Sequence, residues 1–199
     1  MGEIGFCKSK TRFPPPLFPP RMGDMGVDYK YMKIAIISDI HDNIPNLEKV
    51  LKYLKDNNIK KIICCGDFGT ERTFDKLAEF KGEIFTVLGN MDEGYVEYNE
   101  IKDKYSHCRV WEVSGEIIID NIRIGFTHKP EDAYLKISEQ KNYFDIYFYG
   151  HTHKPWEQDF QGTRLVNPGN VANQFYPPTF AVFTTENKSL KLITINDLS

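Results

Sequence analysis

From residue 33 onward, short apolar runs alternate with amphipathic stretches, and this alternation limits the folds open to the chain. Lys33–Ser38, Lys61–Cys65 and Ile84–Leu88 suit strands that are buried on both faces. A helix capped by Asn43 follows the first run, and Arg72–Phe80 is predicted as a helix between the other two. Strands that alternate with helices pair in parallel through right-handed crossovers. The sequence therefore predicts a parallel α/β unit at the start of the domain.

Beyond Val110 the pattern changes to short strands separated by turn residues. Asp120–Asn121 joins Glu116–Ile119 to Ile122–Thr127 as a hairpin, which requires antiparallel pairing. A further helix is predicted from residue 131 to about 141. We expect a mixed α/β fold in which two sheets pack face to face with helices outside. The remaining strands are predicted at Asp145–Tyr149, Trp156–Phe160, Thr163–Val166, Phe180–Thr184 and Leu190–Ile195.

Residues 1–31 differ in kind from the rest, because five prolines between positions 14 and 20 prevent a continuous helix or central strand. We expect a disordered leader over 1–31, followed by a single domain over 32–199. A polyproline ligand for a partner domain is the alternative for this segment.

The composition excludes several classes of protein. The chain is 41% hydrophobic and 27% charged, as in ordinary globular domains. A net charge of -3 argues against a broad surface for nucleic acid, and no run reaches the roughly 18 apolar residues of a membrane span. Cys7, Cys64, Cys65 and Cys108 match neither a zinc motif nor a disulfide framework. We therefore expect reduced cysteines in a cytoplasmic protein, with Cys64 and Cys65 on opposite faces of a strand.

Each strong apolar run is followed by a short cluster of residues that can bind a metal. In α/β sheets, residues just past the carboxyl ends of the strands converge on one crevice. Four of the five histidines lie in these clusters, and glycines beside them let the backbone turn. The clusters are Ser38-Asp39-Ile40-His41, Gly66-Asp67, Gly89-Asn90-Met91-Asp92, Thr127-His128 and Gly150-His151-Thr152-His153.

The ligand types indicate which ions would bind. Imidazole with carboxylate suits Mn²⁺, Fe²⁺, Ni²⁺ or Zn²⁺. Seven candidate ligands are too many for one catalytic ion, which typically takes three protein ligands and keeps a position open. Two ions that share the carboxylate of Asp67 would use them all, since a carboxylate offers two oxygens. The candidates are Asp39, His41, Asp67, Asn90, His128, His151 and His153.

These motifs, in this order, resemble the calcineurin-like metallophosphoesterase superfamily, and most of all its small prokaryotic phosphodiesterase branch. The resemblance runs from Met32 to the C-terminus and implies a four-layer αββα sandwich of two mixed sheets flanked by helices. It also implies two divalent ions, for which we expect manganese or nickel, with iron or zinc as alternatives. The implied ligands are Asp39, His41, Asp67 and His153 for one ion, and Asp67, Asn90, His128 and His151 for the other.

Two cations roughly 3.5 to 4 Å apart would clamp the phosphoryl oxygens and activate a bridging water. We therefore expect a phosphodiesterase that hydrolyses P–O ester bonds of a small phosphoester by hydroxide attack, with catalytic roles for Asp67 and Asn90. The alternative is a non-catalytic scaffold, because a retromer subunit resembling this branch uses the fold chiefly for protein contacts. The complete ligand motifs favour catalysis. A homo-oligomer is left open.

Position 91 departs from the family motif. Many relatives have a histidine there that is placed to protonate the leaving oxygen, whereas Met91 cannot donate a proton. Loss of a general acid commonly lowers the rate by about 10² to 10⁴, so we expect weak action on alkyl esters and better action on activated diesters. Asp92, the usual partner of that histidine, is expected either to orient Asn90 or to be a simple loop carboxylate.

Several other polar positions are kept outside the predicted site. His107 is interpreted as a surface residue, and Asn167–Asn170 as a turn beside the site. Lys129 either attracts an anionic substrate or is a solvated surface lysine. We expect substrate specificity to come from loops at 93–99 and 134–143.

Overall fold

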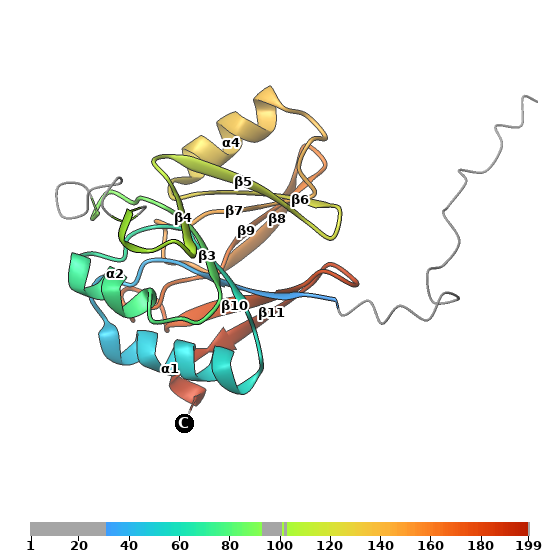
Figure 1. The fold of residues 1–199 in the computed structure, drawn as a ribbon. Helices are drawn as coiled ribbons and strands as arrows, with labels where there is room; N and C mark the ends of the chain where they lie inside the picture. The colour runs from blue at the N-terminus through green and yellow to red at the C-terminus, as the bar shows by residue number, and fades with distance from the viewer. Residues whose placement is uncertain (1–30, 93–100, 102, 199) are drawn as a thin grey trace, which may run out of the picture. The chain divides into compact units, whose positions relative to one another are not determined.

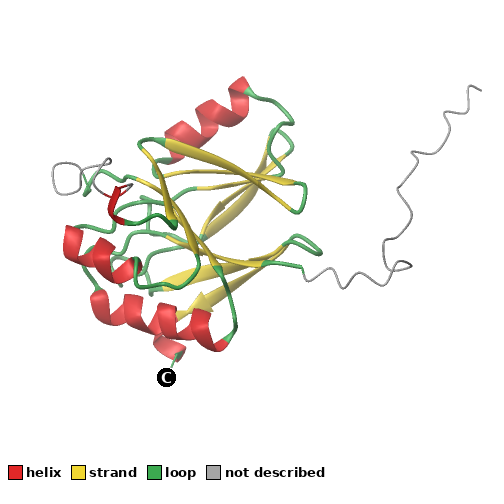
Figure 2. Cartoon of the chain, viewed as in Figure 1, coloured by secondary structure: helices red, strands yellow, loops and turns green. Residues whose placement is uncertain are grey.

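Two β-sheets form the centre of the domain in the computed structural model, which describes residues 31–92, 101 and 103–198. The first sheet has six strands in the order β11-β10-β1-β2-β3-β4, and the second has five in the order β5-β6-β7-β9-β8. Figure 2 shows the strands at the centre and the helices outside them. The predicted leader, up to residue 30, and the predicted loop at 93–99 lie outside the described residues.

The first sheet contains the predicted parallel unit. β1 (Lys33–Ile37), β2 (Lys61–Cys64) and β3 (Glu83–Val87) pair in parallel. The edge strand β4 (Cys108–Trp111) continues the parallel order and was not among the predicted strands. It has only four residues, one of which is an exposed arginine, so its apolar pattern is weak. On the other side, β10 (Thr179–Thr184) and β11 (Ser189–Thr194) add antiparallel pairs and precede the short helix η2 (Ile195–Asp197).

The second sheet begins with the predicted hairpin of β5 (Ser114–Ile119) and β6 (Ile122–Thr127). Its turn residues Asp120 and Asn121 have φ values of 50° and 61°, as a two-residue hairpin with both central φ positive requires. β7 (Ile146–Phe148) then pairs in parallel with β6 and with β9 (Thr163–Asn167). The turn signals do not reveal this parallel pairing. β8 (Trp156–Phe160) closes the edge antiparallel to β9.

The helices lie on the outer faces of the two sheets (Figure 1). α1 (Ile44–Asp56) and α2 (Glu71–Leu77) cover the first sheet, and α4 (Pro130–Glu139) covers the second. The side chain of Asn43 accepts a hydrogen bond of 3.1 Å from the Asn46 N–H and so caps α1 as predicted. Much of the predicted specificity loop at 134–143 belongs to α4 instead, because buried Ala133 and Ile137 anchor that helix one turn apart.

Three hydrophobic clusters fill the spaces between the layers. One lies between the first sheet and α1 and α2, the second between the sheets, and the third beneath α4. Three filled interfaces define four layers, so the predicted αββα sandwich is confirmed. Cys64 belongs to the first cluster and Cys65 to the second, which confirms that they face opposite ways. Both thiols are free, and burial raises the pKa of Cys64 to about 12.

The cluster between the sheets can be tested with two isoleucines of the same hairpin. Ile124 is fully buried between the sheets, whereas Ile118 is largely exposed. We expect Ile124→Ala to lower the free energy of unfolding by about 2 to 5 kcal/mol, because it leaves a cavity in the core. Ile118→Ala is the control and should cost well under half as much. Urea denaturation measures both, and equal losses would contradict the assigned core.

Candidate metal centre

The seven candidate ligands lie together at the carboxyl ends of strands from both sheets. Asp39 and His41 follow β1, Asp67 follows β2, and Asn90 follows β3. In the second sheet, one histidine follows β6 and two follow β7, namely His128, His151 and His153. Strand ends that are 112 residues apart in the chain thus meet at hydrogen-bond distance. The convergence expected from the sequence is therefore present.

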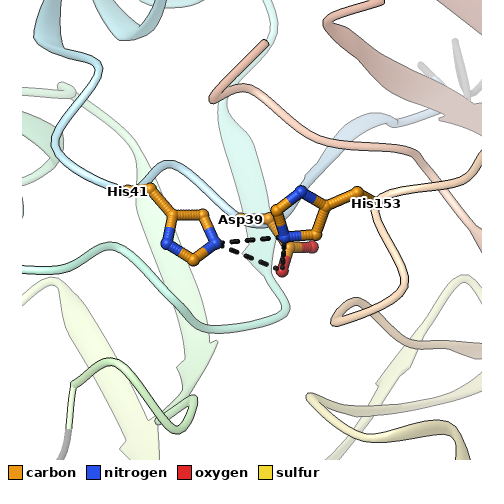
Figure 3. A group of neighbouring side chains, drawn as sticks. All are labelled: Asp39, His41 and His153. Carbon is orange, nitrogen blue, oxygen red and sulfur yellow. Dashed lines mark hydrogen bonds and ion pairs between the residues drawn. The ribbon is translucent and has the colours of Figure 1, made fainter. Parts of the chain in front are cut away.

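The first group consists of Asp39, His41 and His153, whose potential ligand atoms all lie within 4.8 Å of one another (Figure 3). The Nε2 atoms of His41 and His153 are 3.1 Å apart. Asp39 Oδ1 is 3.4 Å from His153 Nε2 and 3.9 Å from His41 Nε2. Both rings therefore direct a nitrogen toward the same buried carboxylate.

The second group consists of Asp67, His128 and His151, also with ligand atoms within 4.8 Å of one another. His128 Nε2 lies 3.1 Å from His151 Nδ1 and 3.3 Å from Asp67 Oδ2. Asn90 Oδ1 joins this group at 3.0 Å from His128 Nε2. The same oxygen of Asp67 is 3.5 Å from His41 Nε2 in the first group. Asp67 therefore lies between the two groups.

Proton positions at these histidines follow from their other contacts. His128 Nδ1 is 2.8 Å from the Cys65 carbonyl, and His153 Nδ1 is 3.4 Å from the Gln174 carbonyl. A carbonyl can only accept, so each Nδ1 carries a proton, and Nε2 presents a lone pair in the neutral ring or donates a second proton in the imidazolium. When His128 is neutral, its Nε2 faces Asn90 Oδ1 acceptor to acceptor. Such a set of lone pairs requires a shared positive charge, from an imidazolium proton or a metal ion.

Charge in the site is dominated by two buried carboxylates, Asp39 and Asp67. Burial by itself would raise the pKa of Asp39, but hydrogen bonds from His153 and His41 outweigh it and hold that pKa well below its usual value. Burial would likewise raise the pKa of Asp67, but the hydrogen bond and the charge of His128 outweigh burial and lower that pKa. The hydrogen bond to Asp39 raises the pKa of His153 in turn. The carboxylates thus stay ionised and favour cations beside them.

Five of the seven candidate ligands have left-handed backbone conformations. Their φ values are 53° at Asp39, 44° at His41, 55° at Asp67, 67° at His151 and 60° at His153. Residues other than glycine adopt this region rarely, at a cost of about 1 to 3 kcal/mol each, and such strain gathers at functional sites. The strain turns side chains from several strand ends into one crevice. The sequence gives no direct signal for it.

Two of the glycines beside the ligands are needed because neighbouring loops come close to their Cα atoms, and not for the sharp turn expected from the sequence. Only Gly66, with φ of 86°, has a positive φ among Gly66, Gly89 and Gly150. A Cβ on Gly89 would lie 2.1 Å from Asp67 Oδ1, and one on Gly150 would lie 1.9 Å from Ser38 Oγ. Glycine is therefore required where neighbouring strand ends touch.

Asp92 connects the loops that follow β2 and β3. Its buried carboxylate accepts hydrogen bonds from the backbone N–H groups of Asp67 at 2.9 Å, Gly69 at 2.9 Å and Gly89 at 2.7 Å. Burial nevertheless raises its pKa to about 6. Neither sequence interpretation anticipates this role. Asp92 holds the loop that carries Asp67, and it also holds Gly89, the residue before Asn90.

Backbone and amide contacts fix the other ligand loops. The N–H of Met91 donates to Asp67 Oδ1 at 2.8 Å, while the methionine side chain is 46% exposed. The buried amide of Asn167 donates to the Gly150 carbonyl at 2.8 Å, and that of Asn170 to the His153 carbonyl at 3.1 Å. The predicted turn at 167–170 therefore positions the histidine loop. Its asparagines look like ordinary turn residues in the sequence.

A cavity of about 270 Å³ adjoins the second group and is lined by Asn90, His128, Lys129 and Asp132, among others. Lys129 is exposed on its wall, next to His128. This position agrees with both interpretations of Lys129. His107 lies outside both groups, where it is partly exposed and its Nε2 is 3.0 Å from the Ala78 carbonyl.

Comparison with known proteins establishes the family. The model of the calcineurin-like phosphoesterase superfamily domain matches residues 32–188, so the chain belongs to this superfamily. Phosphodiesterase MJ0936 of Methanocaldococcus jannaschii is 26% identical over 165 residues, which cover 82% of this chain and 99% of the relative. Phosphodiesterase YfcE of Escherichia coli is 24% identical over 187 residues, covering 84% and 95%. The resemblance to small prokaryotic phosphodiesterases is confirmed, and it assigns the chain to the metal-dependent hydrolases.

Solved structures share the fold. A structure of an archaeal phosphodiesterase matches with a TM-score of 0.73 at 27% identity, covering 82% of this chain and 99% of its own. Vps29 of Chaetomium thermophilum matches with a TM-score of 0.59 at 19% identity, covering 81% and 95%, and shows the fold alone. None of the helices in the described part of the chain has the length and apolar character needed to cross a membrane.

The positioning role of Asp92 can be tested with Asp92→Asn. Asparagine would turn an N–H₂ group toward backbone donors, leaving at least one of them without an acceptor. We expect a loss of about 1 to 3 kcal/mol in the free energy of unfolding and weaker Mn²⁺ binding by roughly 10- to 100-fold. Urea denaturation and titration calorimetry measure the two effects. Asp159→Asn, at an exposed carboxylate, is the control, and the same small effects from both variants would refute the role.

Proposed function

We propose that the chain is a dinuclear metal-dependent phosphodiesterase that hydrolyses P–O ester bonds in a small phosphoester. The observation that supports this most strongly is the position of Asp67 Oδ2, 3.5 Å from His41 Nε2 and 3.3 Å from His128 Nε2. One carboxylate oxygen within reach of both groups is what two ions with a common ligand require.

The donor set fits borderline divalent ions. Each group combines a buried carboxylate with imidazole nitrogens, and the hydrogen bond from His128 Nδ1 to the Cys65 carbonyl leaves Nε2 for a metal. We propose manganese or nickel, with iron or zinc as alternatives. Asp39, His41, Asp67 and His153 would hold one ion, and Asp67, Asn90, His128 and His151 the other.

When bound, two such ions would lower the pKa of a shared water, so that hydroxide attacks the phosphorus, and would offset charge on the phosphoryl oxygens. The protein's own contribution is to keep the ligands ionised and in place. Asp67 is fixed by the Met91 N–H, and Asn90 carries an exposed amide that can donate to a phosphoryl oxygen. Lys129, exposed on the cavity wall, would attract the substrate's negative charge. No covalent enzyme intermediate is needed.

A non-catalytic scaffold is the second candidate, because the Vps29 fold matches over most of the chain. Fold alone does not separate the two functions. The presence of both ligand groups and of a cavity beside Asn90 and His128 supports the enzyme. The free, buried cysteines support the cytoplasmic location that we propose for it.

Hydrolysis and metal content together test the proposed function. Protein reconstituted with Mn²⁺ or Ni²⁺ should contain two ions per chain and hydrolyse bis-p-nitrophenyl phosphate. Asp67→Ala should lower kcat/KM at least about 10³-fold, since both ions lose a ligand. Asn90→Ala, at an exposed position, is a second variant that should keep its fold and lose activity. Two bound ions without hydrolysis of monoesters or diesters would support the scaffold, and one ion per chain would exclude the dinuclear site.

Met91→His tests the missing general acid. Met91 follows the candidate ligand Asn90 and is exposed, so an imidazole can be introduced there without disturbing the core. We expect up to about a 10²-fold gain in kcat for alkyl esters and little change for nitrophenyl esters, which need no protonation to leave. The gain should fall below the usual range because the Asp92 carboxylate is already occupied by three backbone donors. Met91→Leu is the matched control, and equal alkyl-ester rates in both variants would refute the explanation.

A further inference from the structure

Phe175 is the most exposed large hydrophobic side chain among the described residues, at 90%. Isolated apolar side chains on a surface are common and need no function. Phe175, however, lies beside the candidate metal centre. Its ring centroid is 5.4 Å from that of His153, with an interplanar angle of 60°, so the imidazole covers only part of the ring.

The backbone at Phe175 is strained in a way that projects this ring. The Tyr176 N–H donates to the Gln174 carbonyl at 2.7 Å, and φ at Phe175 is 62°. A hydrogen bond between residues two apart across a positive φ defines the rare, strained form of the γ-turn. A phenylalanine thus occupies a backbone conformation that is usual for glycine, and burial of its side chain does not offset the strain. Strain of this kind gathers at sites of binding and catalysis.

The turn is tied to the same residues that hold the metal ligands. Asn170 accepts from the Gln174 N–H at 3.1 Å and donates to the Tyr176 carbonyl at 3.3 Å. Its amide also donates to the His153 carbonyl at 3.1 Å. One fully buried side chain therefore fixes both the Phe175 turn and the His153 loop. These bonds set the position of the backbone from which the ring projects beside His153.

We propose that Phe175 is an aromatic platform on which an aromatic group of the substrate stacks, so that the site takes phosphoesters bearing a nucleobase or an aryl group. This specificity rests on the proposed function, since the phosphoryl group must be held at the metal centre. An exposed ring beside that centre, carried by a backbone turn that is held by hydrogen bonds, offers a stacking face with little backbone ordering left to do on binding. Removal of such a platform commonly weakens binding by about 5- to 100-fold.

The test compares two monoesters of the same charge, phenyl phosphate and methyl phosphate, by titration calorimetry with Mn²⁺-loaded protein. Wild type should bind phenyl phosphate at least about fivefold more tightly. Phe175→Leu should remove that preference and leave methyl phosphate unchanged, whereas Phe175→Tyr should retain it. Tyr134→Leu, which removes an exposed aromatic residue of α4, is the control and should leave the preference intact.

A preference that survives in Phe175→Leu, or no preference in wild type, would overturn the platform. The melting temperature of Phe175→Leu should stay within about 2 °C of wild type because the side chain is exposed. Adenosine monophosphate and ribose 5-phosphate form a second pair of ligands. A larger ratio of affinities in this pair than between phenyl and methyl phosphate would assign the platform to nucleobases. Affinity is obtained from the titration and hydrolysis from a separate assay, so loss of the preference and absence of hydrolysis are separate results.

Discussion

Two carboxylates buried away from bulk solvent are the constraint on which the rest of the centre depends. Asp39 and Asp67 are buried and ionised, and ionised groups in that setting are stable only beside positive charge. The imidazoles of His41, His128 and His153 lie within 4 Å of one or the other. Where those imidazoles are neutral, divalent ions are the natural counter-charge. Binding of cations would thus offset the charge of the buried carboxylates in addition to serving the catalysis that we propose.

The charged side chains are carried by strained turns, and hydrogen bonds connect these turns to one another. Left-handed backbone at Asp39 and His151 is held by a direct bond, since the His151 N–H lies 3.1 Å from both carboxylate oxygens of Asp39. Asp92 connects the loops after β2 and β3, and Asn170 connects the His153 loop to the turn that presents Phe175. Each strained residue is therefore fixed by bonds from a neighbouring loop, as local strain requires if it is to persist.

The sequence predicts the features that recur along the chain, namely the apolar strands and the polar residues that follow them. Apolar runs such as Lys33–Ser38 reveal buried strands, and polar residues at their ends locate the candidate ligands, because both signals are local. The four-residue edge strand β4 and the parallel pairing of β7 lack a strong local pattern. The roles of Asp92 and Asn170 depend on backbone groups distant in the chain, and the projection of Phe175 depends on its φ. No spacing of residue types encodes these features.

The candidate ligands are divided between the two sheets. Asp39, His41, Asp67 and Asn90 follow strands of the first sheet, whereas His128, His151 and His153 follow strands of the second. Neither sheet alone can complete either ligand group, so ions would act as cross-links between the two halves of the sandwich. A ligand that binds only the native state stabilises it by about 4 kcal/mol at a thousandfold excess over its Kd. Metal supply would then set how firmly the sheets stay together, and chelation would loosen the molecule along the plane between them.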